Sequence, residues 1–107
     1  MHTILRVTMN DVSMANSAIE SGRLGQIIQK VSDLIKPESS FFYSEQGHRA
    51  GIFVFNMTDS SMIPLIAEPF FTELNAKVEF MPAMDAKELA KGLDSWSKQA
   101  PIHQSLS

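Results

Sequence analysis

The chain has 107 residues and no cysteine, with 44% apolar residues, 20% charged residues and a net charge of −3. This length and composition fit one domain with a two-layer core, and they exclude disulfides, cysteine-ligated zinc and thiol catalysis. The acidic balance disfavours a broad nucleic-acid or anionic-membrane surface, and no apolar run approaches the roughly 20 residues that cross a bilayer. We therefore expect a cytoplasmic domain with no nucleic-acid and no membrane partner.

The first predicted element is a strand over residues 3–9. Polarity alternates along it with a period of two, which indicates a strand rather than a signal peptide. One face should meet the helices because it holds only apolar side chains: Leu5, Val7 and Met9. Arg6 lies on the other face, so we expect it on the open side of the sheet.

Helical signals follow the first strand. We expect a connection over Asn10–Asn16, and then a capping-box spacing at Ser17–Glu20. Gly22 and Gly25 weaken helical continuity, so a short helical turn should precede the main helix. The main helix is indicated by an apolar stripe: Ile27, Ile28, Val31, Leu34 and Ile35. Pro37 ends it, because the residue before a proline avoids the helical region.

A pair of strands is predicted over Phe41–Glu45 and Ala50–Met57, with a turn at Gln46-Gly47-His48. The second of these strands is apolar on both faces, which is typical of a strand that is covered on both sides. Tyr43 and Glu45 share one face of the first strand. Whether that face is the open one depends on the register, because a slip of one residue exchanges the faces.

The second half of the chain begins with N-cap candidates at Thr58–Ser61. Pro64 falls in the first turn of the next helix, where a missing N–H costs little. We expect Pro69 to break or kink this helix around Glu68. A fourth strand is predicted over Lys77–Pro82, with Lys77, Glu79 and Met81 on its open face.

The last helix is predicted by a capping box at Asp85–Glu88 and an apolar stripe at Leu89, Leu93 and Trp96. Residues 1–98 therefore form a single domain, and residues 99–107 are expected to be a mobile tail. The full order is strand–helix–strand–strand–helix–strand plus a helix. It predicts an α+β fold of the ferredoxin-like type with a four-stranded antiparallel sheet.

This topology predicts a polar site on the open face of the sheet. The expected strand order is four, one, three, two, so Arg6 and Glu79 become neighbours on that face. They form either a charged clamp for a carboxylate or polar ligand, or a structural ion pair at an interface. Tyr43 could join them or serve as an interface aromatic. Glu68 could point at a ligand or cap backbone groups near Pro69.

Other chemistries lack their motifs. The three histidines, His2, His48 and His103, lie far apart, so a histidine metal site is not expected. His48 and Arg49 are either a solvated turn or a grip for phosphate or carboxylate. There is no phosphate-binding glycine loop and no nucleophile-elbow serine. The RNA-recognition pattern fails at Gly51 and neighbouring positions, and no cofactor is implied.

Short motifs between Asn16 and Leu89 carry a family resemblance. They are Asn16, Gly22, Pro37-Glu38, Gly47, Arg49, Ala67-Glu68-Pro69, Pro82 and Met84. On these residues the chain resembles a family of small uncharacterised bacterial proteins of the dimeric α+β barrel type. The wider group includes cofactor-independent monooxygenases, muconolactone-isomerase-like enzymes and haem-degrading enzymes. The resemblance implies a homodimer with a cavity between two facing sheets, but no particular reaction.

Three functional hypotheses follow. The first is a homodimer that binds a small organic ligand between its sheets, with four candidate binding residues: Arg6, Tyr43, Glu68 and Glu79. The second is a monooxygenase- or isomerase-like enzyme without a cofactor, in which Arg6, Tyr43 or Glu79 steers a proton or stabilises an enolate-like intermediate. The third is a protein-interaction module whose open face has no pocket.

Overall fold

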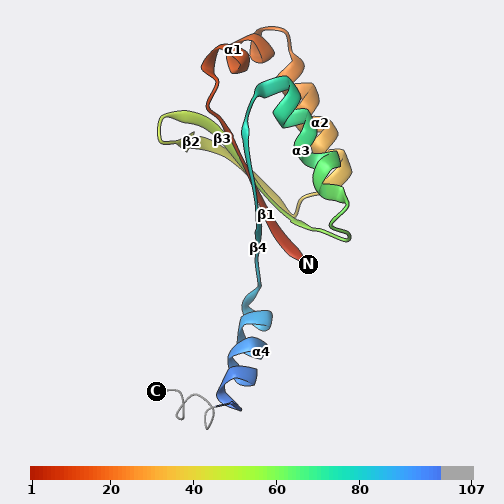
Figure 1. Ribbon diagram of the computed structural model, residues 1–107, viewed down its shortest axis with the longest axis vertical. Helices are drawn as coiled ribbons and strands as arrows, with labels where there is room; N and C mark the ends of the chain where they lie inside the picture. Colours follow the sequence, from red (N-terminus) through yellow and green to blue (C-terminus); the bar gives the residue numbers. More distant parts are fainter. Residues whose placement is uncertain (100–107) are drawn as a thin grey trace.

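The computed structural model describes residues 1–99, so the tail predicted over residues 99–107 lies outside them except for Gln99. The fold is α+β, and its element order is consistent with the ferredoxin-like plan (Figure 1). Its strands are β1 (His2–Met9), β2 (Ser39–Glu45), β3 (His48–Asn56) and β4 (Lys77–Pro82). Its helices are α1 (Val12–Glu20), α2 (Arg23–Ile35), α3 (Met62–Leu74) and α4 (Ala86–Ser97). None of these helices is both long and apolar enough to cross a membrane.

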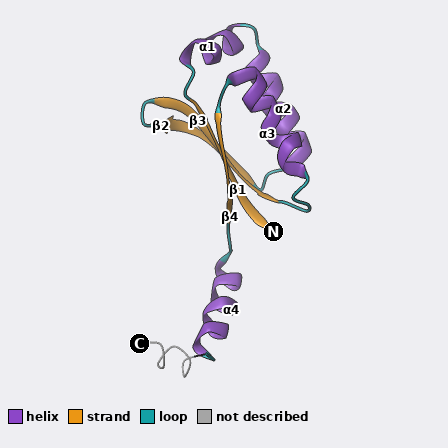
Figure 2. Ribbon diagram, in the orientation of Figure 1, coloured by secondary structure: helices purple, strands orange, loops and turns teal. Residues whose placement is uncertain are grey.

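The four strands form one antiparallel sheet in the order β2-β3-β1-β4, as the sequence predicts. Helices α1, α2 and α3 lie on one side of this sheet (Figure 2). The core between the two layers contains fully buried side chains from β1, β3 and α3: Leu5, Phe53, Phe55, Ile66, Phe70 and Leu74. Burying these side chains supplies the main driving force for folding.

Helix α1 corrects the expected connection over Asn10–Asn16. The helix begins at Val12, and the Asp11 carboxylate accepts a hydrogen bond from the backbone N–H of Met14 at 3.1 Å. Ala15 and Ala18 are the residues that α1 buries, and these small side chains do not form a conspicuous apolar stripe. The break before the main helix is where the glycines indicated it, since Gly22 has a positive φ of 77°.

Helix α2 follows its predicted stripe. Ile27, Val31 and Ile35 are buried against the sheet, whereas Leu34 lies at the margin with 42% of its surface exposed. The helix ends at a left-handed residue directly before Pro37. This C-terminus is the one that the proline predicts, because the residue before it cannot continue the helix.

The hairpin between β2 and β3 is tighter than expected. Glu45 pairs with His48, so the loop has two residues and His48 belongs to β3 instead of the turn. Both loop residues have positive φ, 50° at Gln46 and 83° at Gly47. This conformation suits a type I′ turn, whose twist matches that of the flanking strands.

Helix α3 is continuous across Pro69, so of the expected break or kink around Glu68 the break is wrong. Pro69 cannot donate a hydrogen bond to the carbonyl of Leu65, which lies on the exposed side of the helix where water can reach it. On the other side, Ile66, Phe70 and Leu74 are fully buried. Their packing holds the helix against the sheet despite the missing bond.

Helix α4 extends away from the rest of the molecule, beyond the end of the sheet (Figure 1). The predicted capping box is present between Asp85 and Glu88, yet α4 buries none of its residues. The molecule measures 60 × 27 × 21 Å, and its radius of gyration is 18.1 Å. A compact domain of this length has a value of about 13 Å. The protein is therefore elongated because of α4.

Candidate functional site

The face of the sheet opposite α1–α3, here called the open face, divides into two halves. In the register, Ile4 lies between Val54 and Met81, at the end of the sheet nearest α4. These residues and their neighbours form the apolar half: Ile4, Phe41, Ile52, Val54 and Met81. The polar half begins with Arg6 and Glu79, which share a cross-strand row with Ile52 and Phe41, and continues toward the β2–β3 turn: Arg6, Thr8, Tyr43, Glu45, His48, Lys77 and Glu79.

The centre of the polar half is the predicted pair of Arg6 and Glu79. The two residues are direct cross-strand partners, and two parallel hydrogen bonds join them at 3.0 Å, Nε to Oε1 and Nη2 to Oε2. Both side chains are about two-thirds buried, at 31% and 30% exposure. Hydrogen bonding to Arg6 lowers the pKa of Glu79, and the carboxylate in turn raises the pKa of Arg6.

The register settles which face Tyr43 occupies. Tyr43 pairs with Ala50 and lies on the open face with Glu45. Its hydroxyl donates to Glu45 Oε1 at 3.1 Å, and the same oxygen accepts from Arg6 Nη1 at 3.4 Å. Partial burial raises the pKa of the Tyr43 phenol, and its hydrogen bond to Glu45 raises it further. The phenol is therefore protonated at neutral pH and acts as a donor.

A pocket of about 360 Å³ opens over this network. Its lining comes from all four strands and the adjoining turns: Arg6, Thr8, Asn10, Glu45, Gln46, His48, Lys77 and Glu79. Arg6 already donates to both carboxylates, so it positions them instead of presenting a bare cation. Lys77 Nζ lies 3.9 Å from Glu79 Oε1 and is 60% exposed. The pocket therefore offers carboxylate acceptors at its base and an ammonium donor at its rim.

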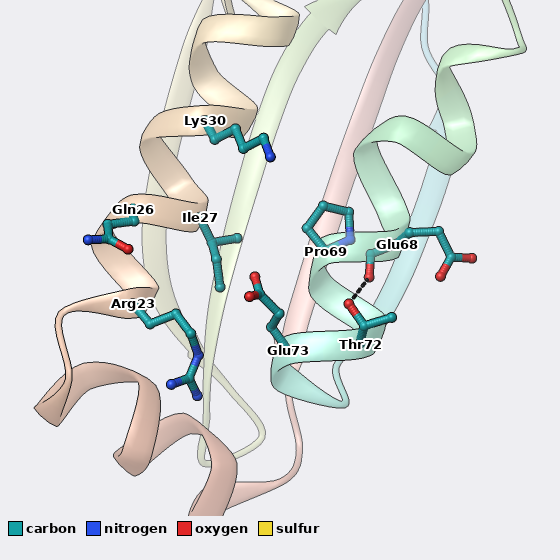
Figure 3. A pocket seen from close by; sticks show the side chains of 8 residues that line it. All are labelled: Arg23, Gln26, Ile27, Lys30, Glu68, Pro69, Thr72 and Glu73. Atoms are coloured by element: carbon teal, nitrogen blue, oxygen red, sulfur yellow. Dashed lines mark hydrogen bonds between the residues drawn. The ribbon is translucent and has the colours of Figure 1, made fainter.

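Glu68 lies apart from the other three candidates. It is an exposed residue of α3, on the helix side of the sheet, at a groove of about 450 Å³ between α2 and α3. In Figure 3 its carboxylate points away from this groove, whereas Glu73 points toward α2. Its backbone carbonyl accepts a hydrogen bond from the hydroxyl of Thr72 at 2.9 Å. The structure thus places Arg6, Tyr43 and Glu79 together and Glu68 elsewhere.

His48 and Arg49 do not form a joint grip, because consecutive strand residues point to opposite faces. His48 lines the pocket on the open face. Arg49 lies on the helix side, where its guanidinium donates to the side-chain oxygen of Asn16 at 3.0 Å. This bond ties the hairpin to α1, which is a structural role.

A group of possible metal ligands occurs at the start of α4. Ligand atoms of His2, Asp85 and Glu88 lie within 4.8 Å of one another. Sequence spacing did not reveal this group, because β1 and α4 are distant along the chain. Asp85 accepts from the Glu88 N–H at 2.8 Å, and Glu88 Oε1 contacts His2 Nδ1 at 2.9 Å. These contacts are those of a helix cap joined to β1, so they account for the cluster without an ion.

Glu45, Lys77 and His48 are site residues outside the four candidate binding residues. The sequence leaves the face of Glu45 open, puts Lys77 on the open face without a role, and gives His48 as either a solvated turn or a phosphate- or carboxylate-binding residue. Their signal is present in the alternation of β2, β3 and β4, but it can be read only once the two-residue turn sets the register. Comparison with known proteins found no matching family model, no matching curated protein and no matching solved structure. The function must therefore be argued from the site itself.

Proposed function

We propose that this chain is a ligand-binding protein that holds a small polar organic molecule in the pocket of the polar half and works as a homodimer through its open face. One observation carries the proposal. The Arg6–Glu79–Glu45 network is two-thirds buried on a strand face that no helix of the described chain covers. Polar groups arranged at the base of a concave site are typical of positions that orient a ligand.

The chemistry of the pocket favours a ligand that carries both hydrogen-bond donors and a negatively charged group. Amino or hydroxyl groups of the ligand would donate to Glu45 and Glu79, which are held in place by Arg6. A carboxylate of the ligand would reach Lys77 at the rim. An aromatic ring would find Tyr43 next to the pocket. We therefore expect an amino- or hydroxy-substituted carboxylic acid, in line with the carboxylate or polar ligand that the sequence suggests for Arg6 and Glu79.

The apolar half supports pairing of two copies. Ile52 and Val54 on β3, together with Ile4 on β1, are only partly buried in a single chain. Contiguous apolar surface of this kind, bordered by polar residues, is typical of an interaction site. A second copy over the open face would remove this surface from water and would deepen the adjoining pocket.

Native mass spectrometry of freshly purified protein tests the proposal. We expect a dimer that carries a co-purified small molecule and loses it in Arg6→Ala without dissociating. Arg23→Ala is the matched control, because Arg23 is partly exposed, bonds only to Ser21 among the described residues and lines the groove between α2 and α3. Retention in Arg6→Ala with loss in Arg23→Ala would contradict the proposal and place the ligand between the helices. A monomer without a ligand would contradict the proposal as well and would favour the third hypothesis, a protein-interaction module whose open face has no pocket.

A second candidate function is catalysis without a cofactor, of the monooxygenase or isomerase kind. The observation that favours it is the chain of bonds from Tyr43 to Glu45 to Arg6. The raised pKa keeps the Tyr43 phenol protonated, and its one O–H could turn from Glu45 to an enolate-like oxygen as negative charge develops there. Tyr43→Phe separates the two functions, because an enzyme would keep its ligand and lose turnover, whereas a binding protein would only bind more weakly.

A further inference from the structure

Helix α4 has an amphipathic surface that stays largely exposed against residues 1–99, the part of the chain that the structure describes. Its apolar side, here called the α4 stripe, consists of Met84, Leu89, Leu93 and Trp96, which are 64%, 46%, 58% and 60% exposed. Gly92 lies among them and makes the stripe slightly concave. The opposite side carries Lys87, Lys91, Asp94, Ser95 and Lys98. Such a strict division is typical of a helix that packs against another surface.

The start of α4 directs the helix away from its own sheet. The Ala83 N–H donates to the carbonyl of His2 at 2.9 Å, which continues the β4–β1 pairing past Pro82. One turn later, Glu88 Oε1 contacts His2 Nδ1 at 2.9 Å and also accepts from the N–H of Asp85. These bonds fix the first turn at the end of the sheet (Figure 1). Leu89 and Leu93 therefore project beyond the sheet that their own chain supplies.

We propose that α4 is an exchanged arm, which packs the α4 stripe on the apolar half of the open face of a second copy and receives the partner's α4 in return. The dimensions agree. Twelve helical residues extend about 18 Å, and the four strands that form the apolar half span about 14 Å. The apolar half lies at the end of the sheet next to α4, where Ile4 pairs with Met81. Each chain has one α4 stripe and one apolar half, so two copies can exchange their helices.

A second copy fits this surface better than an unrelated protein does. One helix about 18 Å long and about 10 Å wide buries at most a few hundred Å², below the roughly 800 Å² per partner of a stable interface. A two-fold exchange gives each copy one donated and one accepted helix, which doubles the contact. The charges of the two segments also favour contact between two copies, because the α4 segment has more cations than acids and the rest of the chain has more acids than cations. Residues 86–107 carry three lysines and two acids, whereas residues 1–85 carry six cationic and ten acidic side chains.

This inference rests on the same pairing of two copies as the proposed function, but it assigns the contact to α4. The absence of cysteine allows a direct test, because every introduced thiol is unique. Leu93→Cys and Val54→Cys, one of them with a mass tag, are co-expressed and treated with a short bismaleimide. We expect a cross-linked heterodimer. Ser95→Cys with Val54→Cys is the control, because Ser95 faces away from the stripe, and it should cross-link at least tenfold less.

A second measurement compares the solution mass of Leu93→Asp with that of Ser95→Asp, which adds the same charge on the other side of α4. We expect Leu93→Asp to run at the monomer mass of 11.9 kDa and Ser95→Asp at twice that mass. Because α4 buries no residue, neither variant should unfold the body, and circular dichroism checks this. Equal masses for the two variants, or equal cross-linking of the two cysteine pairs, would overturn the exchanged arm. A dimer that keeps its ligand in Leu93→Asp would leave the proposed function intact.

Discussion

At the scale of single residues, Glu45 Oε1 is the atom on which the site depends, because it accepts hydrogen bonds from both Tyr43 and Arg6. The chain has one tyrosine, so the phenolate absorbance reports Tyr43 alone. We predict an alkaline titration midpoint above the ordinary pKa of 10.0. Glu45→Gln should lower this midpoint, because the hydrogen bond to Glu45 and its negative charge both raise the pKa of Tyr43.

The neighbouring cation should have the opposite effect on the same titration. Arg6 lowers the pKa of Tyr43 by hydrogen bonding and by its charge, so Arg6→Ala should raise the midpoint above that of the unmodified protein. Arg23→Ala, on the helix side of the sheet, should leave it unchanged. A midpoint that shifts in the same direction in Glu45→Gln and Arg6→Ala would contradict the arrangement of the three side chains.

Glu79 predicts how stability depends on pH. Its pKa is lowered in the folded protein from an ordinary value of 4.5, so the unfolded chain binds this proton more readily. The contribution to stability is therefore present above pH 4.5 and is lost as the pH falls through the folded pKa. We expect Glu79→Gln to lower the urea midpoint at neutral pH and to approach the unmodified protein in acid. Glu20→Gln, on the exposed surface of α1, is the control, and a pH-independent difference would contradict the prediction.

The cross-strand pair of Arg6 and Glu79 could be predicted from sequence because it requires only alternation and the order of strands. Each charged residue alternates with the apolar side chains that face the helices, and the topology makes β1 and β4 neighbours. Glu45 could not be assigned in the same way. Its face depends on a register that the two positive-φ residues of the turn determine.

At the scale of elements, the β2–β3 turn gives the sharpest prediction. Gly47 has a φ of 83° with open space around it, so a methyl group there meets backbone strain and no clash. Gly47→Ala should therefore destabilise the protein by about 1–2 kcal/mol. Gly25→Ala makes the same chemical change in the first turns of α2, also in open space and without a positive φ. It should stabilise the protein by about 0.5–1 kcal/mol. Urea unfolding measures both changes in the free energy of unfolding. If the two substitutions changed it in the same direction, the explanation from the positive φ of Gly47 would be contradicted.

The elements predicted most accurately are those with strong local patterns. The strand over Lys77–Pro82 has the bounds expected from its alternation, and the cap at Asp85–Glu88 is present. The sequence predicts only a short helical turn from Ser17 where α1 begins at Val12, because the buried residues of α1 are alanines, which are too small to create a visible stripe. The effect of Pro69 was overestimated, since tertiary packing of Phe70 and Leu74 outweighs one missing hydrogen bond.

At the scale of the whole molecule, the direction of α4 could not be predicted. The stripe of Leu89 and Leu93 indicates that one side of the helix needs a partner, but it says nothing about which surface provides it. The direction depends on contacts between His2 and the residues after β4, which are more than 80 positions apart in the chain. Long-range contacts of this kind leave no periodic signal in either segment.

The exposure of α4 predicts that the stability of this helix depends on protein concentration. A helix of 12 residues without buried side chains is only marginally stable in water, whereas packing on another surface stabilises it. We therefore expect the backbone amides of α4 to be protected from hydrogen exchange at concentrations that favour the dimer. On dilution they should exchange faster, while the amides of β1 and β3 keep their rates.

Two controls identify the cause of this protection. In Leu93→Asp the amides of α4 should exchange rapidly at every concentration, because the stripe can no longer pack on a second copy. In Ser95→Asp, which changes the other side of the helix, they should behave as in the unmodified protein. Slow exchange in dilute Leu93→Asp would mean that contacts within one chain stabilise α4. The elongated shape would then be a property of the monomer, and the open face would need a different cover.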